Sequence, residues 1–172
     1  MQCPSCQNPL SEQSVAGLAV FACVGSCGGL WFPRRAVRCL SALPRAAGHA
    51  LLALPRAEGV RLFRDPEHPC PRCQTTLLYR HGFIPRLETE IDQCAKCGGF
   101  WVDPGALARL NDPDLPEEKR QALARDYFEE LFEKRVRGMN LVNHDTLEAA
   151  REIIRIFQFI TPEAYGPSHF EL

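Results

Sequence analysis

Eight of the nine cysteines in the chain stand in four closely spaced pairs. Three pairs enclose two residues each, and the pair Cys23/Cys27 encloses three. Two cysteines on one tight turn can bind the same metal ion, and two such turns supply the four sulfurs of a tetrahedral zinc site. We therefore expect two structural zinc ions. The expected ligands are Cys3, Cys6, Cys23 and Cys27 for one ion and Cys70, Cys73, Cys94 and Cys97 for the other.

Paired cysteines also form disulfides or thiol redox sites. A redox Cys-Pro-x-Cys motif stands at the start of a helix in a β-α-β unit, and nothing around Cys3–Cys6 or Cys70–Cys73 has that context. The sequence shows no secretion signal and no apolar run long enough to span a membrane. A cytoplasmic location is the resulting expectation, and there thiols are usually reduced. Both points favour metal binding.

The cysteine pairs belong to a unit that occurs twice. Each unit opens with Cys-Pro-x-Cys and closes with Cys-Gly-Gly, one apolar residue and a tryptophan, Trp31 or Trp101. The copies are offset by 67 residues at the first cysteine and by 70 at the tryptophan. Such an internal repeat predicts two structural units of the same kind.

Short strands and one helix must position the cysteines within each unit. The strand pattern is clearest over Val15–Ala22 in the first unit, and the runs Thr75–Tyr79 and Leu87–Ile91 predict a hairpin in the second. After each tryptophan a helix is expected. Pro33 opens the first, and Asp103 caps the second, which has a proline at its first position.

The remaining chain is predicted to be helical or to connect the units. We expect a small α+β protein: two zinc ribbons, each a β-hairpin plus a short helix, followed by a C-terminal helical pair whose first helix covers 117–137. The predicted divisions are residues 1–43 for the first ribbon with its helix, 44–67 for a partly helical linker, 68–111 for the second ribbon and 112–172 for the helical hairpin and tail.

The charge is unevenly distributed along the chain. The formal net charge is −1, but residues 1–64 carry seven arginines and two glutamates, a net charge of +5. Overall neutrality gives no general attraction to nucleic acid. Within the basic part, Arg34, Arg35 and Arg38 are possible nucleic-acid contacts, although a solvated helix face is the simpler interpretation.

The second unit resembles the transcription factor IIB-type zinc ribbon found in many small bacterial proteins. The resemblance rests on Cys70-Pro71-Arg72-Cys73 and on Asp92-Gln93-Cys94-Ala95-Lys96-Cys97-Gly98-Gly99-Phe100-Trp101-Val102-Asp103. The first unit matches at its four paired cysteines and at Pro4, Gly28, Gly29 and Trp31, but it has a longer second turn and Pro33 in place of Asp103. The resemblance implies the ribbon fold and a zinc ion in each copy, and it implies little about function.

Three further residues have a simple structural interpretation. Trp31 and Trp101 are expected to be buried, each covering the metal turns of its own small ribbon, rather than to serve as exposed stacking platforms. Cys39, the unpaired cysteine, is expected to be a small buried apolar residue.

The sequence contains no carboxylate pair, no nucleophile beside a base and no phosphate loop, so we expect no enzymatic activity. The function it favours is that of a protein-interaction or adaptor module with an unidentified protein partner. The alternative is a nucleic-acid-binding, transcription-related protein that uses the basic first ribbon. A positive stripe would favour nucleic acid, and an apolar patch would favour a protein partner.

Overall fold

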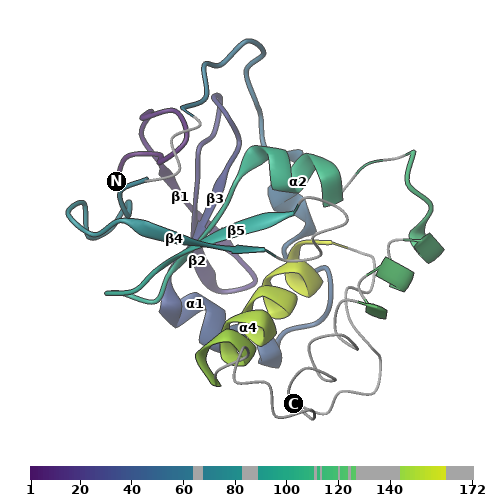
Figure 1. Ribbon diagram of the computed structural model, residues 1–172. Helices are drawn as coiled ribbons and strands as arrows, with labels where there is room; N and C mark the ends of the chain where they lie inside the picture. The colour runs from purple at the N-terminus through teal and green to yellow at the C-terminus, as the bar shows by residue number, and fades with distance from the viewer. Residues whose placement is uncertain are drawn as a thin grey trace.

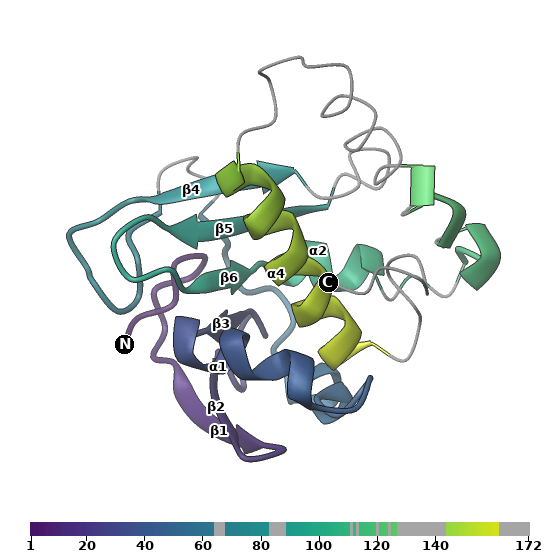
Figure 2. The ribbon, with the colours of Figure 1, turned by 90° about the horizontal axis from the view of Figure 1, so that it is seen from below.

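The computed structural model describes residues 1–63, 68–82, 89–110, 112, 114–119, 121–123, 125–126 and 144–161 (Figure 1). Six strands form one antiparallel sheet in the order β1-β2-β3-β6-β5-β4. Figure 2 shows them side by side, with α4 crossing one face. The strands are β1 (Ser11–Val15), β2 (Leu18–Ala22), β3 (Leu30–Phe32), β4 (Leu78–Gly82), β5 (Glu90–Cys94) and β6 (Phe100–Val102).

The two ribbons meet at the centre of this sheet. Strand β3 of the first ribbon pairs with β6 of the second, and Trp31 lies directly opposite Trp101. On either side of this pair the strand order is the same, with β2 and β1 on one side and β5 and β4 on the other. The sheet therefore has an approximate twofold axis between the two tryptophans, which is the arrangement of an isologous dimer within one chain.

The first hairpin corrects one sequence prediction. Val15–Ala22 is not a single strand, because the chain turns at Ala16 and Gly17, whose φ angles are 49° and 77°. Two successive residues in the left-handed region form the tight two-residue turn that matches the twist of a hairpin. The strand pattern thus includes the end of β1, the turn and the whole of β2.

In the second hairpin the strands begin three residues later than predicted. The observed strands are Leu78–Gly82 and Glu90–Cys94, and their register pairs Leu78 with Cys94. The ligand Cys94 is therefore the last residue of β5, and the strands are placed by the metal-binding turns at their ends. Residues 83–88 lie outside the described part of the chain.

Short helices and α4 (His144–Ile160) cover one face of the sheet. The other helical segments are α1 (Arg34–Cys39), the 3-10 turns η1 (Leu40–Ala42) and η2 (His49–Ala53), and α2 (Pro104–Leu110). As predicted, Asp103 caps α2, because its Oδ1 accepts a hydrogen bond of 2.7 Å from the Gly105 amide. Side chains along each strand point alternately to the two faces of the sheet. They form two separate clusters, one under the helices and one that contains the paired cysteines and the tryptophans.

Helix α4 packs into the core formed by both ribbons. Ile156 and Phe157 are fully buried, and Phe159 meets the Phe32 ring edge-on with centroids 6.3 Å apart. The linker joins the same core, since the amides of Ala46 and Gly48 donate to carbonyls in the last turn of α4, each at 2.8 Å. This satisfies carbonyl groups that a helix end otherwise leaves unpaired.

The predicted fold class is confirmed as two zinc ribbons with a C-terminal helix. Within 117–137, the described residues 117–119, 121–123 and 125–126 are helical, and the rest of that predicted helix lies outside the described residues. The division into four units stays a prediction. No helix among the described residues is long and apolar enough to cross a membrane.

Candidate metal centres

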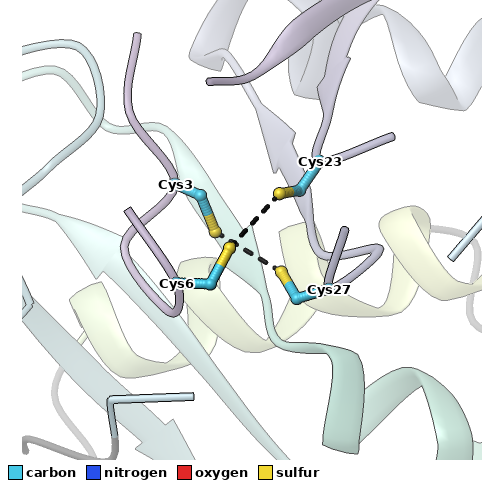
Figure 3. Close-up of side chains that lie close together, drawn as sticks. All are labelled: Cys3, Cys6, Cys23 and Cys27. Atoms are coloured by element: carbon cyan, nitrogen blue, oxygen red, sulfur yellow. Dashed lines mark hydrogen bonds between the residues drawn. The ribbon is translucent and has the colours of Figure 1, made fainter. Parts of the chain in front are cut away.

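The four cysteines of the first ribbon converge on one point from two turns (Figure 3). The first turn carries Cys3 and Cys6, and the second turn, after β2, carries Cys23 and Cys27. The Sγ atoms of Cys3 and Cys27 are 3.5 Å apart, as are those of Cys6 and Cys23. All four residues are buried.

The second ribbon repeats this arrangement at a more open site. Its first turn carries Cys70 and Cys73, and its second turn carries Cys94 and Cys97. The Sγ–Sγ distances are 3.7 Å for Cys70–Cys97 and 3.9 Å for Cys73–Cys94. Cys73 and Cys97 are half-buried.

The sulfur geometry fits zinc at both sites. A tetrahedron with Zn–S bonds of about 2.3 Å has sulfurs about 3.8 Å apart, and in each cluster all four sulfurs lie within 4.8 Å of one another. A disulfide would require a distance of about 2.0 Å, whereas all nine cysteines are free thiols. The predicted ligand sets are thus brought together, and the two groups match two zinc ions.

Thiol protonation at the first site follows from its geometry. A hydrogen bond between Cys3 and Cys27 raises the pKa of Cys3 far above its usual value and lowers the pKa of Cys27 to about 6. Burial raises the pKa of Cys23 to about 11. Zinc binds thiolates and must displace these protons, so the affinity of this site for zinc should increase as the pH rises.

The longer second turn of the first ribbon has a structural use. Its extra residue lets the turn pair with the linker: the Gly25 amide donates to the Pro55 carbonyl at 2.7 Å, and the Ala57 amide donates to the Ser26 carbonyl at 2.9 Å. Ser26 also accepts from Asn8 Nδ2 at 2.6 Å. The departure from the two-residue spacing therefore attaches the linker to the zinc turn and does not prevent the cysteines from converging.

The tryptophans are buried, as predicted, but each lies against the second turn of the other ribbon. A Cβ atom at Gly29 would be 2.3 Å from Cζ2 of Trp101, and one at Gly99 would be 2.3 Å from Cζ2 of Trp31. Sequence reasoning assigned each indole ring to its own ribbon. The prediction that each ring covers its own ribbon is wrong, because the β3–β6 pairing brings each ring across the twofold axis to the other ribbon.

Ser5 is a site residue that the sequence did not indicate. It lies between Cys3 and Cys6, accepts a hydrogen bond of 3.1 Å from Trp101 Nε1 and donates one of 2.9 Å to Asp103. The equivalent of Ser5 in the second ribbon is Arg72, which has no acceptor atom, and among the described residues Trp31 Nε1 has no partner. One difference in the sequence could have indicated this asymmetry between the ribbons: the second ribbon has Asp103 where the first has Pro33.

Cys39 is exposed, which corrects the prediction that it is buried. In α1 the buried side is formed by Ala36 and Val37 and is continued by Leu40 in η1. Cys39 lies outside this stripe, beside the exposed Arg38.

This exposure gives a measurable thiol count. In the zinc-loaded protein we expect about one cysteine, Cys39, to react rapidly with a thiol reagent, because the other eight are metal ligands. All nine should react after denaturation with a chelator. The Cys39→Ser variant should show no rapid reaction. Rapid reaction of four thiols in that variant, or of five in the unmodified protein, would mean that one site holds no metal.

We further expect two zinc ions per chain when the protein is purified without added metal. The reason is that two complete sets of four sulfurs are present, and ribbons of this size need metal to fold. Elemental analysis of the purified protein measures this directly. A value near one would leave one site without metal, and iron with visible absorbance would contradict the zinc assignment.

Arg34, Arg35 and Arg38, the possible nucleic-acid contacts, are all exposed on α1. Burial and the nearby Glu148 raise the pKa of Glu152 on α4, and the charges of Arg34 and Arg38 act in the opposite direction. Two of the three arginines thus lie near a carboxylate of the C-terminal helix. Arg34 also lines a cleft of about 170 Å³ beside Cys94 and Gly98.

Comparison with protein families agrees with this geometry. Residues 2–37 and 69–113 both match the model of the family described as transcription factor zinc-finger, the TFIIB-type zinc ribbon. Each matched segment contains one complete set of four cysteines, so the chain carries two copies of this ribbon. Comparisons with curated proteins and with solved structures gave no match.

Proposed function

Since the chain carries two TFIIB-type zinc ribbons, we propose that it is a non-enzymatic adaptor in which the metal sites support a binding surface for a protein partner. The observation that carries this proposal is a groove of about 730 Å³ between the first turns of the two ribbons. Its lining residues are Met1, Gln2, Cys3, Pro4, Gln7, Phe63, His68, Pro69, Cys70, Pro71 and Gln74.

The lining of this groove suits an uncharged peptide segment. Phe63 and Met1 expose 39% and 41% of their surface and so offer two large apolar side chains in the same groove. Gln7 and Gln74 occupy equivalent positions after the two first turns and supply amide donors and acceptors. Apolar contacts surrounded by hydrogen-bonding groups are typical of protein interfaces.

The same lining argues against a phosphate backbone as the ligand. Among the described residues that form the groove there is no lysine, arginine, aspartate or glutamate. Binding to nucleic acid depends on lysine and arginine contacts with phosphates. Two of the three arginines of α1, Arg34 and Arg38, lie near Glu152 of α4, which supports the protein partner over the nucleic-acid alternative.

The metal sites support a role without catalysis. A catalytic zinc keeps one position open for water or substrate, whereas four thiolates fill all four positions. Both clusters offer four sulfurs from residues that converge within 4.8 Å. Zinc at these sites would hold the first turns at a fixed separation and so maintain the groove.

A photocrosslinking experiment tests the groove. A benzophenone amino acid at Gln74, inside the groove, is expected to capture a protein in native cells, and the same group at the exposed Ser14 on β1 serves as the control. Capture should resist nuclease and moderate salt and should be lost in Phe63→Asp. Equal capture from both positions, or persistence in Phe63→Asp, would contradict the proposal.

The alternative function has its own measurement. Fluorescence anisotropy with labelled DNA and RNA should show at most weak binding, which falls on the order of a hundredfold or more between low and physiological salt. Submicromolar affinity at physiological salt that is abolished by alanine at Arg34, Arg35 and Arg38 would replace the adaptor proposal with nucleic-acid binding.

A further inference from the structure

An arginine side chain lies against the second turn of each ribbon, at the glycine that follows the last cysteine. A Cβ atom at Gly28 would be 2.5 Å from Nε of Arg56, and one at Gly98 would be 2.8 Å from Cδ of Arg34 and 3.4 Å from its Nε. Both glycines have positive φ angles, 81° and 64°. The glycines leave the space in which these arginines lie.

The two arginines reach equivalent glycines from unrelated parts of the chain. Arg34 begins α1 of the first ribbon and extends to the turn of the second ribbon. Arg56 belongs to the linker and is held at its own turn by the hydrogen bonds of Pro55 and Ala57. By the offset of the repeat, the position equivalent to Arg34 is Pro104, so the repeat alone does not produce this pairing.

What the two glycines share is their place beside a zinc-thiolate group. Four thiolates and one zinc ion leave an excess of two negative charges. Holding such a charge away from water is costly unless positive groups or hydrogen-bond donors lie near it. The guanidinium group is always charged, which makes arginine suited to this position.

We propose that Arg34 and Arg56 are positioning residues for the metal, each placing a positive charge beside one zinc site. Arg56 acts on the site of the first ribbon. Arg34 acts across the twofold axis on the site of the second ribbon, whose Cys73 and Cys97 are half-buried. Arg34 therefore links the metal affinity of one ribbon to the helix of the other.

The test measures the affinity of each site separately in the full-length protein. Cadmium-113 replaces zinc, and its two resonances are assigned through couplings to the cysteine β-protons. A competing chelator then removes the metal. Arg34→Met is expected to weaken the second site by about 10- to 100-fold, the usual effect of losing an outer-shell partner, and to leave the first site unchanged while the second site still holds its metal. Arg56→Met should show the reverse.

Four further variants separate charge from packing. Arg35→Met, an exposed neighbour on the same helix, should change neither site. Arg34→Lys should retain most of the affinity that Arg34→Gln loses, and this comparison stands even if the methionine variant fails to fold. Glu152→Gln should not weaken the second site, since Arg34 is proposed to act directly.

The proposal is overturned by any of three results. The first is an equal loss of metal affinity at both sites in Arg34→Met. The second is an equal metal affinity of the second site in Arg34→Lys and Arg34→Gln. The third is a loss of affinity at the second site in Glu152→Gln as large as that in Arg34→Met. The last result would mean that Arg34 acts by holding α4.

Discussion

Replacing Cys97 with serine is expected to destabilise both ribbons and α4 together, not the second ribbon alone. The variant loses one of the four sulfurs of the second site. The binding free energy of a structural zinc ion is on the order of 10 kcal/mol and is part of the folding free energy. Trp31 lies against Gly99 in the turn that would lose its metal, and β3 pairs with β6. The first ribbon therefore depends on the second.

Thermal unfolding followed by far-UV circular dichroism and tryptophan fluorescence measures this dependence, with elemental analysis for zinc. We expect one transition at a midpoint well below that of the parent protein. Cys39→Ser is the matched control, because its thiol is exposed and belongs to neither cluster, and it should change stability by less than about 0.5 kcal/mol. A second transition at the parental midpoint would show that the ribbons, or the C-terminal helix, are independent units.

Adding one methyl group at Gly99 or Gly29 is expected to destabilise the whole protein. The new Cβ would be 2.3 Å from a fully buried indole ring of the opposite ribbon, which has no room to move at the centre of the sheet. Overpacking of this kind costs about 1–3 kcal/mol and occasionally more. Neither glycine has a positive φ, so the effect is steric.

Chemical denaturation measures the free energy of unfolding of Gly99→Ala, Gly29→Ala and a control variant. The control is Gly82→Ala, since Gly82 has no positive φ and a Cβ there would meet no atom of the described residues within 4 Å. Replacing the opposing indole with the smaller phenyl ring should relieve part of the steric clash. The loss of stability in Gly99→Ala combined with Trp31→Phe should therefore be smaller than the sum of the losses in the two single variants. Trp101→Phe should have this effect only with Gly29→Ala. Rescue of Gly99→Ala by Trp101→Phe instead would contradict the crossed packing.

The metal sites follow from the sequence because their chemistry depends on local spacing. Two cysteines separated by two or three residues share one turn, and a turn needs only its own residues to bring two sulfurs together. The repeat then identifies which turns belong together, and all eight predicted ligands do converge as two sets. The cap formed by Asp103 is equally local, since the bond to the Gly105 amide spans two residues.

The relation between the two copies was decided by tertiary structure. Nothing in the pattern around Trp31 or Trp101 indicates that β3 would pair with β6, because an apolar strand edge can be covered by a helix, another strand or a partner chain. That pairing places each indole ring on the opposite ribbon and makes Ser5 a partner of Trp101 and Asp103. It also aligns α1 and α4 on one face, so that Arg34 reaches the second site.

The exposure of Cys39 was also decided by tertiary structure. Its neighbours Val37 and Leu40 are apolar, but which side of a six-residue helix is buried depends on where the sheet lies. The sequence determined that the chain binds two zinc ions in two ribbons, because metal ligation is a matter of a few residues on a turn. Only the packing of the ribbons against each other decided which residues surround each ion, since those contacts join parts of the chain about 70 residues apart.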